Sequence, residues 1–222
     1  MCTPRFLGRL RIIKQLTSEN KFSLSVGCKD TRIASINLDI ARQYFPDIVA
    51  DARYLPFKPN TFTRIFFTDV IQYIPGDGEV RALSEINRVL IEGGELILTA
   101  PNRILLFTIT DLSHYLIGQE QRQKRYGREE ISRFLEITGF KAVRLFTSGL
   151  FWAMLNWFFY CLVTYPVKKL THFHLPYVPS AFENQEDKEF HEIQNSGYTI
   201  FVKAIKRNMC NQQRRCLTPS TT

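Results

Sequence analysis

Five short runs of β-branched and aromatic residues constrain the fold of this 222-residue chain more than any other feature. Within each run the apolar residues are nearly continuous rather than alternating, which is typical of strands buried on both faces of a parallel sheet. We therefore predict strands over residues 22–27, 35–40, 46–51, 63–70 and 94–100.

Segments with helical periodicity separate and follow these strands. Residues 79–90 repeat apolar side chains about every third position, and the Gly93–Gly94 pair beyond them favours a helix stop. Amphipathic patterns over residues 6–16 and 128–137 predict two more helices, and residues 141–146 and 198–205 predict two more strands. Strand–helix alternation predicts an α/β fold with helices on both faces of the sheet.

Composition excludes several classes of protein. The chain is 45% hydrophobic and 23% charged, so it can bury a core and is not disordered throughout. The net charge is +8, but the excess lies toward the two ends and the middle is mildly acidic, unlike the basic stripe of a nucleic-acid groove. We expect no nucleic-acid partner; the basic ends favour either a solubilising surface or contact with anionic lipid.

The five cysteines lack the spacing of metal ligands, so no metal site is expected. A reduced, cytoplasmic protein is the default for such cysteine usage, and the first 16 residues lack the apolar run of a signal peptide. The cytoplasmic expectation includes the alternative of a peripheral membrane contact.

Polar residues end the first four predicted strands. Gly27 ends the first strand, and Asp39, Asp51 and Asp69 end the second, third and fourth. Ligands of open α/β sheets bind outside the carboxyl ends of the strands, so these residues predict a ligand site. Capping of the following helices is the alternative role of Asp39 and Asp51.

At these positions the chain resembles a class I S-adenosylmethionine-dependent methyltransferase of the type-11-like group. The resemblance covers Phe22–Asn102 and rests on four stretches, which read SVGC (25–28), INLDI (36–40), DIVADARYLPFKPNTF (47–62) and EINRVLIEGGELILTAPN (85–102). It implies a Rossmann-like, open, mostly parallel seven-stranded sheet with an antiparallel last strand, and S-adenosyl-L-methionine as cofactor.

The resemblance also implies roles for residues near the sugar and base of the cofactor. Asp39 would accept hydrogen bonds from both ribose hydroxyls. Asp51 would accept one from the adenine amino group, beside the backbone amide of Ala52. Ile40 and Leu55 would enclose the purine between apolar side chains.

Four more residues would lie near the methionine end of the cofactor. Gly27 and Cys28 form a turn whose backbone would approach this end of the cofactor, since no Cβ intervenes at Gly27. Thr68 and Asp69 would lie near the cationic sulfonium, for which an acidic rim is suited.

The chain departs from the family pattern in its first motif. No second glycine follows Gly27, and only seven residues separate Gly27 from Ser35. This connection is too short for a full crossover helix, so we expect the first helix to be missing or reduced to a turn. The alternative function is therefore a degenerate methyltransferase-like binding or scaffold protein without turnover.

A catalytic base is needed only if the methyl acceptor is a hydroxyl or similar group. The candidate is His114, in the segment DLSHYL after the fifth strand, and Tyr73 is the second candidate, with Tyr115 and Tyr126 as alternates. A surface or packing role is the alternative for His114.

Residues 145–167 contain no charged side chain over 23 positions. The alternatives are a lid or membrane-surface helix, a core or dimer helix, and a membrane span. A lid or surface helix favours a small apolar acceptor, such as a lipid or a lipid-linked sugar.

We expect a single methyltransferase-like domain over residues 1–205. It comprises an N-terminal helix (1–21), a cofactor-binding core (22–102), an acceptor or lid region (103–197) and a last strand (198–205). Residues 206–222 are expected to form a disordered basic tail.

Overall fold

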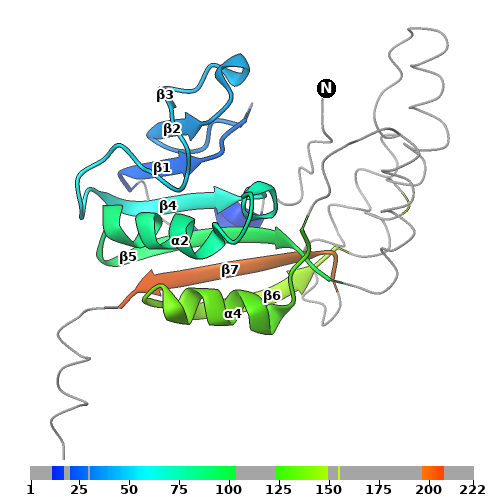
Figure 1. Ribbon diagram of the computed structural model, residues 1–222. Coiled ribbons are helices and arrows are strands. Elements are labelled where there is room, and N and C mark those ends of the chain that lie inside the picture. Colours follow the sequence, from blue (N-terminus) through cyan, green and yellow to red (C-terminus); the bar gives the residue numbers. More distant parts are fainter. Residues whose placement is uncertain are drawn as a thin grey trace, which may run out of the picture. The chain divides into compact units, whose positions relative to one another are not determined.

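The computed structural model describes residues 12–17, 21–29, 31–103, 124–149, 155 and 197–207. They form one open seven-stranded sheet in the order β3-β2-β1-β4-β5-β7-β6 (Figure 1). Strands β1 to β5 pair in parallel, and β7 runs in the opposite direction (Figure 1). The predicted α/β fold with an antiparallel last strand is confirmed.

The strands are β1 (Ser23–Val26), β2 (Ile36–Asp39), β3 (Ile48–Val49), β4 (Phe62–Thr68), β5 (Leu90–Pro101), β6 (Phe140–Ser148) and β7 (Thr199–Lys206). The helices are α2 (Glu79–Val89) and α4 (Arg128–Ile137), with 3-10 turns η1 (Arg42–Tyr44) and η2 (Ile71–Tyr73). Residues 12–15 are also helical, within the N-terminal helix predicted over residues 6–16.

The chain divides into two compact units that interleave along the sequence. One comprises Met1–Ser18, Pro101–Tyr126 and Phe146–Phe201, and the other comprises Glu19–Ala100, Gly127–Leu145 and Val202–Thr222. The predicted subdivision runs linearly along the chain, whereas these units alternate. All the predicted cofactor-binding residues lie in the second unit, which we call the core unit.

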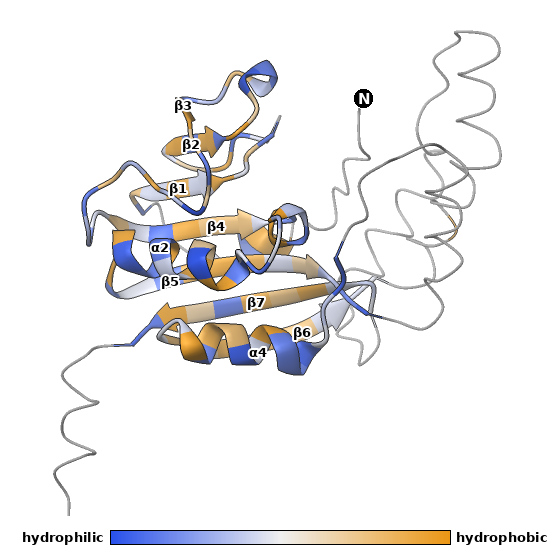
Figure 2. Cartoon of the chain, in the orientation of Figure 1, coloured by the Kyte–Doolittle hydropathy of each residue, from blue (hydrophilic) through white to orange (hydrophobic). Residues whose placement is uncertain are grey.

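One face of the sheet in the core unit is apolar. Leu24 and Val26 of β1 lie on it with Ile65 and Phe67 of β4, and each is at most 1% exposed. Helices α2 and α4 lie against one another on one side of the sheet (Figure 1). Hydrophobic residues predominate along β4, β5 and β7 (Figure 2), which is the pattern expected of central strands.

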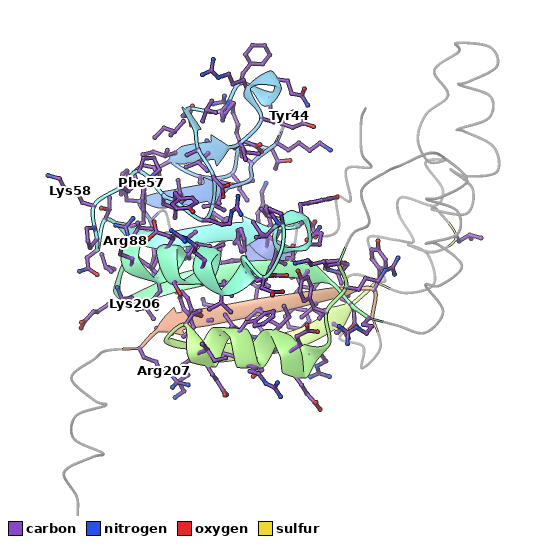
Figure 3. The ribbon with its side chains drawn as sticks, viewed as in Figure 1. Tyr44, Phe57, Lys58, Arg88, Lys206 and Arg207 are labelled. Atoms are coloured by element: carbon purple, nitrogen blue, oxygen red, sulfur yellow. The ribbon has the colours of Figure 1, made fainter. Side chains whose placement is uncertain are left out.

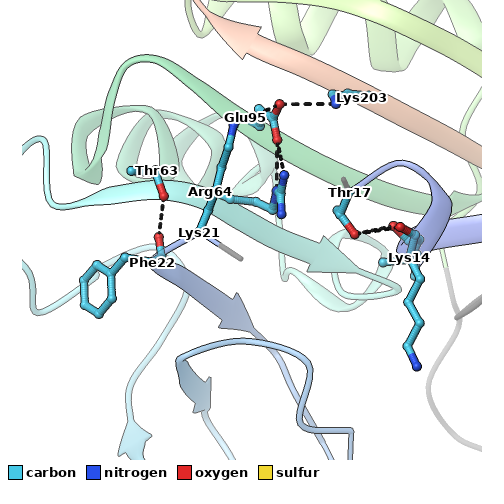
Figure 4. A network of polar contacts seen from close by, with 9 residues as sticks. Lys14, Thr17, Lys21, Phe22, Thr63, Arg64, Glu95 and Lys203 are labelled. Carbon is cyan, nitrogen blue, oxygen red and sulfur yellow. Dashed lines mark hydrogen bonds and ion pairs between the residues drawn. The ribbon is translucent and has the colours of Figure 1, made fainter. Parts of the chain in front are cut away.

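The opposite face of the same strands carries a polar strip beside the buried Phe66 and Ile97. Ser23, Arg64 and Glu95 are register partners across β1, β4 and β5, and Ser25 pairs with Asn37 of β2 in the same way. Glu95 accepts from Arg64 at 2.7 Å, and further ion pairs join it to Lys21 and Lys203 at 3.3 and 3.2 Å (Figure 4).

Side chains of this polar strip bond along the short connection between β1 and β2. Its described residues contain no helix, as the sequence predicts. Instead, Ser23 and Ser35 exchange two hydrogen bonds of 3.2 Å, and the Asn37 side chain donates to the carbonyl of Ala34. A crossover helix needs an apolar surface to pack on, and Ser23, Ser25 and Asn37 do not provide one.

The boundary between α2 and β5 differs from the sequence prediction. Helix α2 ends at Val89, and Leu90 is already extended at the start of β5. The helix does end before Gly93 and Gly94, as predicted, but these glycines do not cap it: they lie within β5, where its pairing with β4 is irregular between Leu90 and Glu95. Helix α2 ends because the chain becomes extended at Leu90, the first residue of β5. Gly93 and Gly94 lie in the part of β5 where the pairing is irregular.

The third strand is shorter than predicted, and β6 continues two residues beyond its predicted end, to Ser148. The apolar segment 145–167 therefore begins as a strand. Beyond Gly149 it lies outside the described residues, except for Leu155, and His114, Tyr115 and residues 208–222 also lie outside them. No helix within the described ranges is long and apolar enough to cross a membrane.

Candidate cofactor-binding site

The turn after β1 is attached to the end of β2. The backbone amides of Gly27 and Cys28 both donate to the carbonyl of Leu38, at 2.7 and 3.1 Å. Because β1 to β4 are parallel, their carboxyl ends meet at one edge of the sheet. The loops that follow these four strands therefore form the candidate site.

Asp39 is the best defined residue of this edge. It is 7% exposed, and its carboxylate accepts the backbone amide of Lys29 on Oδ2 at 2.8 Å and that of Ala41 on Oδ1 at 2.9 Å. No basic side chain among the described residues bonds to it. Each carboxylate oxygen therefore retains capacity for one further hydrogen-bond donor.

Gly27 is held in a conformation that favours glycine. Its φ is 75°, and a Cβ on this residue would lie 2.3 Å from Cγ2 of Val70. Val70 follows β4, so this close contact joins the turn after β1 to the loop after β4. A larger residue at position 27 would separate them.

Cys28 is buried beside Asp39. Burial, and then the negative charge of Asp39, raise the pKa of the Cys28 thiol to about 11. The side chain is 5% exposed, and its Sγ lies 3.5 Å from the carbonyl oxygen of Lys29. At neutral pH the group is a thiol, so it packs in the turn rather than acting as a nucleophile.

Asp51 lies two residues beyond β3, and Arg53 occupies its carboxylate. Oδ1 accepts the Arg53 backbone amide at 2.8 Å and Nε at 3.1 Å, and Oδ2 accepts Nε at 3.1 Å and Nη2 at 2.7 Å. These bonds hold the pKa of Asp51 below its usual range. The sequence analysis missed Arg53; its spacing of two residues from Asp51 was the available signal.

The segment after Asp51 is fastened to α2 by two side chains. Glu85 Oε2 accepts the backbone amide of Leu55 at 2.9 Å, while Arg88 donates to the carbonyls of Leu55 and Phe57 at 2.9 and 2.8 Å (Figure 3). Arg88 also pairs with Glu85 at 2.8 Å and lowers the pKa of that carboxyl. The Leu-Pro-Phe segment thus has a fixed path, set by residues that the sequence analysis did not single out.

Asp69 has a positive φ of 55° after β4. The hydroxyl of Thr99 accepts the Asp69 backbone amide at 2.9 Å and donates to the Asp69 carboxylate at 3.1 Å. Thr68 and Thr99 are register partners. The neighbouring strand β5 therefore positions the carboxylate of Asp69 at the edge of the sheet.

Two of the candidate bases are described, and they differ in exposure. Tyr73 is 48% exposed in η2, whereas Tyr126 is 2% exposed and lies in the other unit. Beside Tyr73, the buried Gln72 has an Oε1 atom without a partner among the described residues. Exposure at the edge makes Tyr73 the more accessible of the two.

The two predicted apolar partners of the purine differ in the same way. Ile40 is 67% exposed just beyond β2, whereas Leu55 is 4% exposed, and Ala52 is buried. The structure thus holds Gly27 and Cys28 against Leu38, the residue before Asp39, and bonds Asp39 to the backbone of Lys29, the residue after Cys28. It places Asp51 at the same edge but bonded to Arg53.

Residues 24–98 match the family model described as "Methyltransferase domain". Together with the sheet order, this match identifies the family over residues 24–98. This segment belongs to a class I methyltransferase domain. The resemblance to the type-11-like group is thereby confirmed, and this family and fold are those of S-adenosylmethionine-dependent methyltransferases.

Solved structures share the fold of this methyltransferase domain at low sequence identity. A Thermotoga maritima methyltransferase described as a "possible histamine N-methyltransferase" is 18% identical, with a TM-score of 0.62 over 91% of this chain and 89% of its own. A methyltransferase from Archaeoglobus fulgidus is 16% identical, with a TM-score of 0.59 over 89% and 91%.

The same fold occurs in the [4+2]-cyclase SpnF, which is 16% identical, with a TM-score of 0.53 over 90% of this chain and 80% of its own. No match is found among curated proteins. At these identities the solved structures establish the fold of the methyltransferase domain, and its chemistry must be argued from the residues.

The residues of the edge fit S-adenosylmethionine at its sugar. Among the described residues, the buried carboxylate of Asp39 accepts two backbone amides, which leaves capacity for two hydroxyl donors. The turn at Gly27 lacks a Cβ, although Val70 fills the space where one would stand. At the base the fit requires Arg53 to share Asp51.

Proposed function

We propose that this chain binds S-adenosyl-L-methionine at the carboxyl edge of β1 to β4 and transfers its methyl group to a small molecule. One observation carries the proposal: Asp39 is a buried carboxylate, held by two backbone amides, with both oxygens able to accept another donor. A ribose presents two adjacent hydroxyls, which match this pair of acceptors.

The other edge residues complete the proposed site. Ile40 would cover one face of the purine, since it is a large apolar side chain left 67% exposed beside Asp39. Leu55 and Ala52 would line the base from the fastened segment, and Asp51 would accept the adenine amino group. The backbone of the turn at Gly27 and Cys28 would approach the methionine end of the cofactor.

When bound, the cofactor supplies a methyl group on a positively charged sulfur. Thr68 and Asp69 would lie near this charge, and Thr99 orients the carboxylate for the purpose. Positioning supplies most of the rate in such a displacement. If the acceptor is a hydroxyl, His114 or the exposed Tyr73 would remove its proton.

For the acceptor we propose an apolar small molecule, such as a lipid or a lipid-linked sugar. The support is the uncharged sequence of residues 145–167. The test incubates the protein with radiolabelled cofactor and either lipid or aqueous cell extract. Label transferred only into the aqueous fraction would contradict the apolar acceptor without touching the proposal of methyl transfer.

Calorimetry with S-adenosylhomocysteine tests the cofactor proposal. We expect binding by the unmodified chain and about ten- to a hundredfold weaker binding by Asp39→Ala, because hydrogen bonds to a charged group are lost. Asp77→Ala is the matched control, since Asp77 is an exposed acid before α2 and should leave binding unchanged. Absence of binding in the unmodified chain would overturn the proposal.

A degenerate methyltransferase-like binding or scaffold protein is the second candidate function. The observation that favours it is the occupation of the edge by the chain itself, with Arg53 on Asp51 and Val70 against Gly27. This function predicts no copurified S-adenosylhomocysteine and no heat on its addition. Mass spectrometry of the native protein separates the two candidates.

A further inference from the structure

Arg53 bonds to both carboxylate oxygens of Asp51 and therefore limits which other donors this carboxylate can accept. Its backbone amide, Nε and Nη2 make four contacts of 2.7 to 3.1 Å with the two oxygens. A carboxylate offers about four lone-pair positions. The three N–H donors of Arg53 fill most of these positions, because the Nε hydrogen is shared between both oxygens.

The Arg53 side chain also packs against the residue before α2. A Cβ on Gly78, the residue before α2, would lie 2.9 Å from Cδ of Arg53 and 2.8 Å from Cγ2 of Ile74. The stem of Arg53 therefore runs close along the start of α2. The contact with Asp51 is partly sheltered, since the side chains of Arg53 and Asp51 are 30% and 23% exposed.

We propose that Arg53 determines the base specificity of the cofactor site by competing with the adenine amino group for Asp51. The inference rests on the proposed function, because it takes Asp51 as the acceptor for this amino group. While Arg53 holds both oxygens, the amino group gains little from Asp51. The site then discriminates weakly between a 6-amino and a 6-oxo purine.

Removal of the guanidinium reverses this balance. In Arg53→Ala the Asp51 carboxylate keeps a single amide contact and can accept the amino group, but it repels the oxygen of a 6-oxo purine. We expect Arg53→Ala to bind S-adenosylhomocysteine about three- to tenfold more tightly, the worth of one net hydrogen bond. Binding of S-inosylhomocysteine should stay equal or weaken.

The experiment is calorimetry of both ligands on the unmodified chain, Arg53→Ala and Arg53→Gln. Both ligands have the same net charge, so losing the positive charge of Arg53 affects both affinities alike. The ratio of the two dissociation constants therefore reports the contact with the 6-amino or 6-oxo group alone. Arg81→Ala is the matched control: its guanidinium stacks on Tyr54 at 4.1 Å and makes no hydrogen bond to Asp51 among the described residues. Thermal melting confirms that each variant folds.

An increase of the S-adenosylhomocysteine preference in both Arg53 variants, absent in Arg81→Ala, supports the inference. An unchanged preference, or weaker binding of both ligands, overturns it and leaves Arg53 as a support for Asp51. If the unmodified chain binds neither ligand, the proposed function itself fails, which is a separate result. A failure to fold by Arg53→Ala leaves Arg53→Gln to decide.

Discussion

Lys29 adopts a left-handed backbone conformation, with φ of 49°, at the turn that carries Asp39. Its backbone amide is one of the two donors to that carboxylate. Side chains other than glycine are strained in this region by roughly 1–2 kcal/mol. The turn keeps the conformation that suits a glycine although the chain has a lysine there.

Substitutions at position 29 therefore have a predictable order of stability. Lys29→Gly should be more stable than Lys29→Ala by about 1 kcal/mol, because alanine keeps the strain and glycine relieves it. The comparison cancels loss of the ammonium, which lies 5.8 Å from the ring of Tyr44. Urea unfolding measures the difference; equal stabilities would contradict the strained turn.

Cys28 provides a second prediction at this scale. Its raised pKa of about 11 and its burial keep it protonated and inaccessible in the folded protein. At pH 8, iodoacetamide should modify Cys28 slowly in the native protein and rapidly in urea. Peptide mass mapping distinguishes it from the other four cysteines. Fast native labelling would show that the turn opens readily.

Among the elements, α2 has a different role on each of its two faces. Ala82, Leu83 and Ile86 are fully buried, whereas Glu85 and Arg88 hold the segment after Asp51. The helix thus packs on the sheet with one face and holds the segment of Leu55 and Phe57 with the other. Its amphipathic pattern is visible in the sequence, but the partners of Glu85 and Arg88 are not.

Removal of the Arg88 guanidinium should loosen this segment. We expect Arg88→Ala to lose about 1–3 kcal/mol of unfolding free energy, since the carbonyls of Leu55 and Phe57 lose donors and Glu85 loses its partner. Arg81→Ala, on the same helix but exposed, should lose less than about 1 kcal/mol. Urea unfolding measures both. A similar loss in the two variants would argue that the fastening contributes little.

The turn at Gly27 joins two elements, and a pair of substitutions tests this. Gly27→Ala should destabilise the fold by about 1–3 kcal/mol, because φ is 75° and the new Cβ would meet Val70. In Gly27→Ala/Val70→Ala the two Val70 methyl groups nearest the new Cβ are absent, so the double variant should be less destabilised than the sum of the single ones. Thermal or urea unfolding of the four proteins measures the coupling; strict additivity would refute the contact.

For the whole molecule, ion pairs set the dependence of stability on acid. Hydrogen bonds from Arg53 and Arg88 lower the pKa of Asp51 and Glu85. Burial alone would raise the pKa of Glu95, but Arg64 and Lys203 outweigh it and the direction is downward. Each folded pKa then lies below its unfolded value.

Carboxyls of this kind stabilise the fold fully above their unfolded pKa, near 4. Their contribution is lost as the pH falls through the lower folded values. Unfolding free energy should therefore be nearly constant from pH 7 to about 5 and should decrease steadily below about 4. Urea unfolding across this range is the measurement, and Glu95→Gln should flatten the acid limb. A constant stability down to pH 2 would contradict the assigned ion pairs.

Much of the fold could be predicted from local pattern. The strands, apart from the length of the third, the start of the fifth and the end of the sixth, and the helices α2 and α4 follow from apolar runs and helical periodicity, because these report burial directly. The polar strip formed by Ser23, Ser25, Asn37, Arg64 and Glu95 could not be predicted in this way, since it depends on the register between strands.

The sequence by itself determined the parallel sheet and the acids at its strand ends, because periodicity and strand-end position are local properties. Tertiary structure alone decided which acids remain open to a ligand. Asp39 is held by two backbone amides and can accept more, whereas Asp51 is held by Arg53. The difference arises because the remaining bonding capacity of a carboxylate depends on which donors the folded chain brings within 3 Å of it.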